Sequence, residues 1–121
     1  MKLPIQYALT YPKRLQSNFP RFNFADYPSL TFEKPDLKTF RNLALAFEAL
    51  NKAGNTPCIL NAANEVVVEQ FLHDKLRFLE MSDVIVDCMS KMPYIGNPSY
   101  EDYVQTDFET RKLAEELIGI G

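Results

Sequence analysis

The chain has 121 residues, of which 46% are hydrophobic and 24% charged, a composition typical of one globular domain with its own core. A formal net charge of −3 and a pI near 5.1 argue against nucleic acid as a partner. No apolar run approaches the roughly 20 residues that cross a bilayer, the polar N-terminus does not resemble a signal peptide, and the two cysteines are too few for a disulfide scaffold or a zinc site. We therefore expect no membrane contact and a location in the reducing cytoplasm.

Residues 1–35 are rich in proline and in aromatic side chains. Prolines recur every seven or eight residues and leave no room for a long helix: Pro12, Pro20, Pro28 and Pro35. Six aromatic residues lie among them: Tyr11, Phe19, Phe22, Phe24, Tyr27 and Phe32. Residues 30–33 alternate apolar and polar side chains, which predicts a short strand with one buried face.

Disordered linkers are normally poor in aromatic residues, because they have no surface on which to bury them. We therefore interpret residues 11–35 as a strap, an extended segment that crosses a folded body. The sequence leaves open whether that body is the helical part of the same chain or protein outside these 121 residues.

From Asp36 onward the apolar residues recur at helical spacing. One stripe predicts a first helix: Phe40, Leu43, Ala44, Phe47 and Leu50. Gly54 suits the left-handed residue that ends a helix, and Thr56 with Pro57 predicts the start of the next one. This second helix, to about Leu72, is apolar almost all round and is therefore expected to be central.

Two further helices and a short one are predicted after Leu72. Ser82 is a candidate N-cap for a helix that ends at Pro93, with Met81 and Val86 as a hydrophobic staple. Ser99 is expected to cap the short helix, and Thr106 with Glu109 to begin the last helix. Two ion pairs are expected on the last helix, Arg111 with Glu115 and Lys112 with Glu116. The fold class is thus mainly α, a small bundle of four or five helices in residues 36–121, preceded by an extended proline- and aromatic-rich strap with one short strand.

Few residues suggest chemistry. His73 could act as a base but is better explained as a surface residue at a helix end, and Cys58 and Cys88 lie in apolar surroundings where thiols behave as small hydrophobes. The carboxylate pairs, Asp83 with Asp87 and Glu115 with Glu116, lack a neighbouring histidine and fit solvated helix faces. None of the four glycines belongs to a phosphate-binding loop.

Three polar residues interrupt the most apolar helix. Asn61, Asn64 and Glu65 are three and four positions apart, so they lie on one side of it. A buried polar group without a partner costs about 1–3 kcal/mol. This side must therefore either face solvent or form a satisfied polar junction with another element, and the junction is the interpretation we favour.

The same run resembles the N-A-A-N-E segment of the C-terminal domain of 1-deoxy-D-xylulose 5-phosphate reductoisomerases. Other motifs agree in order and spacing: Met1 to Ile5 with Pro12, Leu30 to Glu33, Pro35-Asp36, and Phe40 with Glu48-Ala49. The resemblance covers essentially the whole chain. The Pro-Asp pair that precedes the aligned methionine in the family is absent here.

The resemblance implies an enzyme that binds NADPH and Mg²⁺ or Mn²⁺, whose NADPH-binding and catalytic domains lie upstream of these residues and would be the partners of this chain in a homodimer. Residues 1–35 would be the end of the catalytic domain and the linker strap, and 36–121 the C-terminal helical domain. Met1 would lie close to the nicotinamide, as the family's methionine does. The chain itself would brace the catalytic domain and show no turnover alone.

Two other hypotheses stay open on the sequence alone. The chain could be a stand-alone interaction module that grips another protein with its strap. It could also be a small enzyme built around His73 or the carboxylate pairs.

Overall fold

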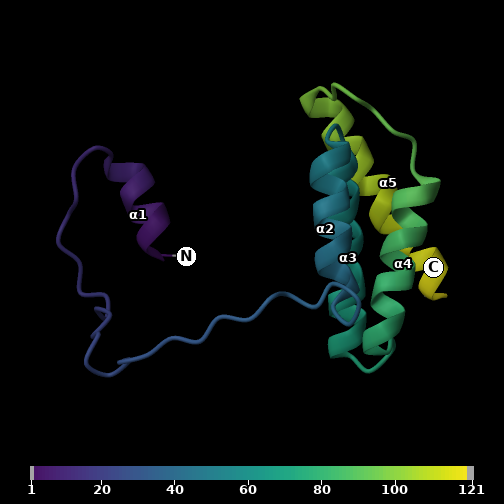
Figure 1. Cartoon of the computed structure of the whole chain (residues 1–121). Helices are drawn as coiled ribbons and strands as arrows, with labels where there is room; N and C mark the ends of the chain where they lie inside the picture. The colour runs from purple at the N-terminus through teal and green to yellow at the C-terminus, as the bar shows by residue number, and fades with distance from the viewer. Residues whose placement is uncertain (1, 120–121) are drawn as a thin grey trace. The chain divides into compact units, whose positions relative to one another are not determined.

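The computed structural model describes residues 2–119, and their regular secondary structure is entirely helical (Figure 1). The helices are α1 (Lys2–Thr10), α2 (Arg41–Lys52), α3 (Thr56–Leu72), α4 (Phe78–Lys91) and α5 (Tyr100–Ile118). The chain divides into two compact units, Met1–Glu33 and Lys34–Gly121, which we describe separately. Among the described residues, no helix has the length and apolarity needed to cross a membrane.

The first unit consists of α1 and an extended segment, and none of its described residues is buried. Residues 2–10, which precede the predicted strap, form the short helix α1. Pro4 lies in the first turn of α1, where a missing N–H breaks no helical hydrogen bond, and Pro12 follows the end of the helix. Further on, Phe22 packs against Phe24 and Tyr27 with ring centroids 4.9 and 5.0 Å apart.

Residues 30–33 form no strand in the structure. A strand requires a neighbouring strand to complete its backbone hydrogen bonds, and the described part of the chain contains none. The predicted strand therefore lacks a partner here.

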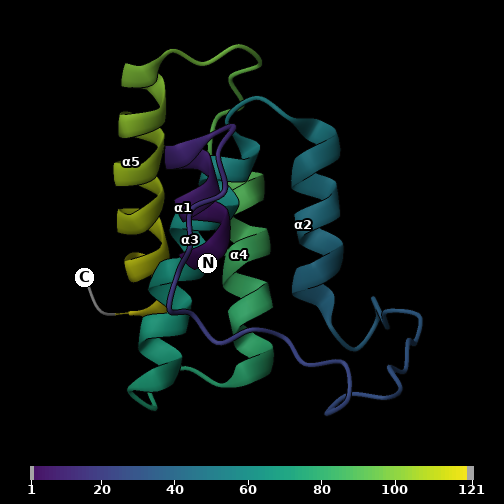
Figure 2. The same cartoon turned by 90° about the vertical axis from the view of Figure 1, so that its left-hand side faces the viewer.

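The second unit is a bundle of α2, α3, α4 and α5, in which consecutive helices run in opposite directions (Figures 1 and 2). Helix α3 contacts each of the other three, which confirms its predicted central position. Its inner face supplies fully buried small residues, Ala62 and Ala63, that let neighbouring helices approach closely. The core is completed by side chains from all four helices: Leu45, Ala49, Ile59, Val66, Val67, Met81, Ile85, Cys88, Met89 and Ala114.

The turn between α2 and α3 is fixed by Gly54 and Asn55. Gly54 has the positive φ predicted for this position (+57°), and Ala53 before it has a positive φ of +56° with ψ −148°. Asn55 is fully buried and binds the segment between α4 and α5: its Nδ2 donates to Pro93 O (3.0 Å) and its Oδ1 accepts from Ile95 N (2.9 Å). Asn55, not Thr56, is the residue that precedes α3.

Two predicted helix starts are wrong. Helix α4 begins at Phe78, because the Glu80 carboxylate accepts from Arg77 N (2.8 Å) and caps the helix there. Ser82 is consequently an interior residue whose Oγ donates to Leu79 O (2.9 Å).

Helix α5 is continuous from the predicted cap at Ser99, whose Oγ accepts from Asp102 N (3.1 Å). Thr106 therefore lies within α5 and does not begin a helix. Its buried Oγ accepts from Asn55 Nδ2 (3.3 Å), so a contact from the turn before α3 replaces the capping role that local sequence suggested.

Candidate functional site

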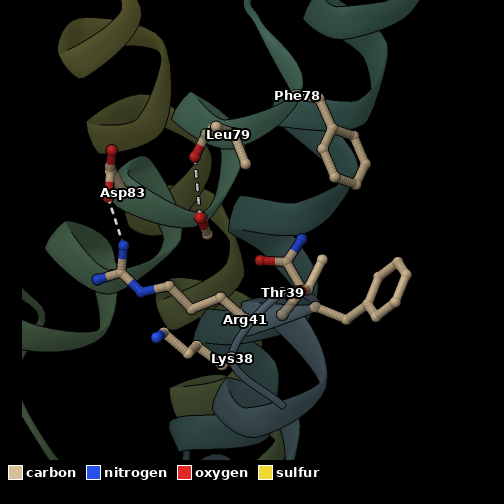
Figure 3. A pocket seen from close by; sticks show the side chains of 9 residues that line it. Lys38, Thr39, Arg41, Phe78, Leu79 and Asp83 are labelled. Carbon is tan, nitrogen blue, oxygen red and sulfur yellow. Dashed lines mark hydrogen bonds and ion pairs between the residues drawn. The ribbon is translucent and has the colours of Figure 1, made fainter. Parts of the chain in front are cut away.

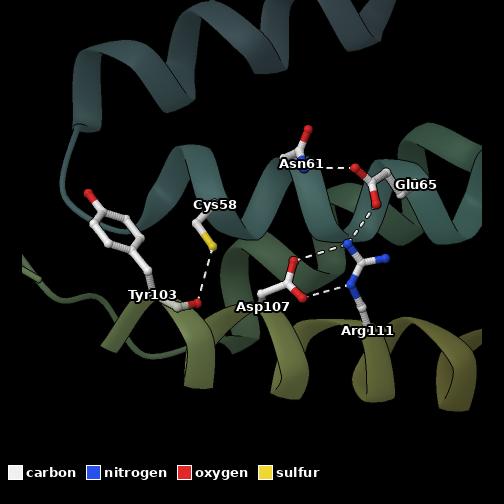
Figure 4. Close-up of polar contacts among 6 residues, drawn as sticks. All are labelled: Cys58, Asn61, Glu65, Tyr103, Asp107 and Arg111. Atoms are coloured by element: carbon white, nitrogen blue, oxygen red, sulfur yellow. Dashed lines mark hydrogen bonds and ion pairs between the residues drawn. The ribbon is translucent and has the colours of Figure 1, made fainter. Parts of the chain in front are cut away.

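A polar network joins α3 to α5 on the surface of the bundle (Figure 4). Asn61 Nδ2 donates to Glu65 Oε1 (3.1 Å), one turn further along α3. Arg111 of α5 donates from Nη2 to Glu65 Oε2 (2.6 Å) and from Nε to Asp107 Oδ2 (2.8 Å). The guanidinium thus bridges two carboxylates on neighbouring helices, and this fixes the two helices in register.

The charges in this network stabilise one another. Hydrogen bonds from Arg111 and then Asn61 hold the pKa of Glu65 below its usual range. Hydrogen bonds to Asp107 and Glu65 raise the pKa of Arg111. More than half of the Glu65 side chain is exposed, so water and salt screen the pair. The network is therefore suited to orienting the helices more than to stabilising them.

The residues that the sequence singled out have different positions. Asn61 and Glu65 are exposed members of the network, whereas Asn64 is half-buried and outside it. The predicted pairing of Arg111 with Glu115 is wrong: Asp107 lies one turn earlier, on the side of α5 that faces α3, and Arg111 turns toward it. Met1 lies outside the described residues.

The other candidates do not converge on one place. His73 is exposed, with Nδ1 2.8 Å from Glu69 O at the end of α3. The Asp83 carboxylate pairs with Arg41 (2.6 Å) and the Asp87 carboxylate with Lys91 (2.8 Å). Residues 2–119 bring together no group of three histidine, cysteine, aspartate or glutamate side chains that could hold a metal ion.

Both thiols are unsuited to act as nucleophiles. Burial raises the pKa of Cys88 to about 11, and its side chain belongs to the core. Burial also raises the pKa of Cys58, whose Sγ lies 3.6 Å from Tyr103 O (Figure 4). Because the thiolate is the reactive form, both are structural at neutral pH.

A shallow cavity of about 270 Å³ lies between the start of α2 and the start of α4 (Figure 3). Its rim carries the ion pair of Arg41 with Asp83, and Phe40 and Phe78 line its apolar part. The volume is at or below the lower end of the range for small-molecule sites, roughly 300 Å³. We therefore regard this cavity as a junction between two helices.

An exposed apolar surface of the bundle lies along α2 and its N-cap residue, Phe40. Four side chains form what we call the α2 stripe, and their exposed fractions run from 38% to 69%: Phe40, Leu43, Phe47 and Leu50. The buried residues of the same helix are Leu45 and Ala49. At 100° per residue these two lie opposite the stripe, so the larger apolar face of α2 points away from the core.

Comparison with known proteins identifies the family to which the chain belongs. Residues 1–113 match the family model described as "DXP reductoisomerase C-terminal domain". The chain belongs to this family. The sequence-based resemblance is thereby confirmed, and the helical bundle is the fold of a DXP reductoisomerase C-terminal domain.

Individual reductoisomerases align with almost the whole chain. The 1-deoxy-D-xylulose 5-phosphate reductoisomerase of Phocaeicola vulgatus is 62% identical over 118 residues, which are 98% of this chain and 31% of that protein. The corresponding protein of Porphyromonas gingivalis is 44% identical, with coverages of 98% and 30%. The chain thus spans about 30% of the length of the relatives it matches.

Solved reductoisomerase structures agree with this alignment. The enzyme from Zymomonas mobilis in complex with NADPH superimposes with a TM-score of 0.83 at 32% identity, over 98% of this chain and 31% of that one. A second, in complex with NADPH, fosmidomycin and magnesium, has a TM-score of 0.80 at 30% identity, with coverages of 97% and 31%.

The lowered pKa of Glu65 predicts a pH dependence of stability. Since the folded pKa lies below the unfolded value, this carboxylate contributes stability above about pH 4.5, and the contribution is lost as pH falls through the folded pKa. We expect Glu65→Gln to destabilise the chain more at pH 7 than at pH 3, measured by urea unfolding. Glu69→Gln, exposed on the same helix and outside the network, is the control. An equal effect of Glu65→Gln at both pH values would contradict the prediction.

Proposed function

We propose that this chain works as the C-terminal domain of a 1-deoxy-D-xylulose 5-phosphate reductoisomerase, bracing the catalytic domain and showing no turnover by itself. The observation that carries the proposal is the family match over residues 1–113. The exposed α2 stripe supports it, and so does the absence of buried residues among the described part of the first unit, since both surfaces need a protein to cover them.

The whole enzyme would rearrange 1-deoxy-D-xylulose 5-phosphate and reduce the aldehyde intermediate with NADPH. The product would be 2-C-methyl-D-erythritol 4-phosphate, on the non-mevalonate route to isoprenoids. A divalent cation, Mg²⁺ or Mn²⁺, would orient the substrate oxygens and stabilise developing charge.

The residues of this chain do not fit those cofactors. Residues 2–119 hold no cluster of metal-binding side chains, and the sequence has no glycine-rich phosphate loop. Apart from Met1, the groups that bind NADPH, metal and substrate would therefore belong to the larger part of the reductoisomerase. The contribution of this chain would be to hold that part in place.

We also propose finer assignments within this role. Residues 1–35 would be the end of the catalytic domain and the linker strap, and 36–121 the helical domain. Residues 30–33 would become a strand when the strap pairs with a sheet edge of the catalytic domain. Met1 would lie near the nicotinamide, and Asn61, Asn64 and Glu65 would form a structural polar junction.

The proposed partners are the catalytic and NADPH-binding domains, in an enzyme that forms a homodimer in the cytoplasm. Neither nucleic acid nor membrane is proposed as a partner. The acidic balance of the chain, with a formal net charge of −3, supports the first exclusion. The exclusion of a membrane rests on the polar character of the sequence.

An NADPH-consumption assay tests the proposal. With 1-deoxy-D-xylulose 5-phosphate and Mn²⁺, we expect the isolated chain to consume NADPH no faster than a heat-killed control. We expect activity in a chimera in which this chain replaces the aligned 118 residues of the Phocaeicola vulgatus relative. Turnover by the chain alone would overturn the inactive role, and a folded but inactive chimera would overturn the bracing role.

A further inference from the structure

We infer that the α2 stripe is the surface through which the bundle docks onto the larger, N-terminal part of the same reductoisomerase polypeptide. The inference rests on the proposed function and adds to it the face of the bundle that meets the partner. Its occupant is an apolar, uncharged surface of that N-terminal part.

The geometry of α2 supports a docking role. A helix at the edge of a bundle normally turns its larger apolar face inward. Here Leu45 and Ala49 face the core, while two phenylalanines and two leucines face outward. At the N-terminal end of α2, the stripe continues into the cavity that Phe40 shares with Phe78 and Leu79 of α4. Both of these α4 side chains are exposed. A surface of this kind on a single domain typically marks an interface.

The size of the stripe favours an occupant in the same polypeptide. Taking about 200 Å² for a fully exposed phenylalanine, the four side chains expose roughly 400 Å². A specific interface between separate molecules buries about 800 Å² on each partner, so pairing of two α2 stripes would be too small. A tethered partner needs less area, because the linker supplies an effective concentration in the millimolar range.

The sequence contains a linker before α2, and the related proteins contain a large further part that could cover the α2 stripe. The strap ends at residue 35, and Phe40, the first residue of the stripe, follows shortly after it in the sequence. The chain accounts for only 31% of the length of its Phocaeicola vulgatus relative. Most of the polypeptide in this family is thus available, on the far side of a short linker, to cover α2.

Cysteine labelling tests the inference in the isolated chain and in the chimera described above. Leu50→Cys places a thiol on the stripe, and Lys112→Cys places one on α5, where the native side chain is 70% exposed. We expect both to label rapidly in the isolated chain. In the chimera, labelling at position 50 should slow by roughly tenfold or more, whereas labelling at 112 should be unchanged. Mass spectrometry separates these sites from Cys58 and Cys88.

A second pair of variants guards against a cysteine variant that does not fold. Phe47→Lys and Glu48→Lys introduce the same residue at adjacent positions, on and off the stripe. We expect only Phe47→Lys to raise the susceptibility of the bundle to protease in the chimera. Equal susceptibility of both variants would count against docking through α2.

The remaining outcomes separate this inference from the proposed function. If the chimera is active but Leu50→Cys still labels rapidly in it, the proposed function stands and docking through the α2 stripe is rejected. If the chimera is inactive but Leu50→Cys labels slowly in it, docking through the α2 stripe stands and the proposed function is rejected. Protection that grows with the concentration of the isolated chain would show a second copy on α2 and overturn the inference.

Discussion

Replacing Asn55 with alanine is expected to lower the free energy of unfolding of the bundle by about 3 kcal/mol. The side chain is fully buried and supports three contacts across the molecule, with Pro93 O, Ile95 N and Thr106 Oγ. Alanine would leave these groups without their partner, and each buried group left unpaired costs about 1–3 kcal/mol. The segment between α4 and α5 would then lose its attachment to the start of α3.

Urea unfolding followed by circular dichroism measures this effect as a shift in midpoint at constant slope. Asn97→Ala is the matched control, because Asn97 lies in the same segment and is exposed. The control should change stability by no more than about 0.5 kcal/mol. A loss below about 1 kcal/mol for Asn55→Ala would mean that water replaces the amide.

The role of Asn55 illustrates a contact that sequence reasoning missed. An asparagine between a glycine and Thr-Pro fits an ordinary turn, and the sequence predicted only the start of α3 nearby. Its partners lie 38 to 51 positions further along the chain. A single sequence contains no signal for such a pairing. The same tertiary contact engages the hydroxyl of Thr106, which lies within α5 because that helix already begins after its cap at Ser99.

Helix α2 shows the limit of apolar periodicity. The spacing correctly predicted a helix that stops before Gly54, since local steps of three and four residues determine helix formation. It also predicted one apolar stripe, and such a stripe normally faces the core. The helix has a second apolar face of Leu45 and Ala49, and this smaller face is the buried one. Which face meets the core depends on what covers the other.

The candidate polar site could be predicted in part. Asn61 and Glu65 stood out because they interrupt an apolar helix, and both belong to the network between α3 and α5. Arg111, the centre of that network, was assigned to Glu115 instead. The i,i+4 rule considers one helix at a time, and the partner across the interface depends on the register of two helices, which periodicity does not give.

Replacing Gly54 with alanine is expected to lower the free energy of unfolding by about 3 kcal/mol, through two effects. The φ of +57° places Gly54 in the left-handed region, which costs a residue with a Cβ roughly 1–2 kcal/mol. An added Cβ would also lie 2.3 Å from Ile95 O and 2.8 Å from a ring carbon of Tyr94. The carbonyl is backbone and cannot move aside without displacing the segment that Asn55 holds.

Gly119→Ala separates the two effects. Gly119 is also left-handed, with φ +81°, but an added Cβ there would meet nothing within 4 Å. This control should therefore report the conformational cost alone, about 1 kcal/mol, and the excess in Gly54→Ala should report the close approach of Ile95. Equal losses of stability in the two variants would show that the turn between α2 and α3 yields to a Cβ, and that Gly54 is required for its φ only.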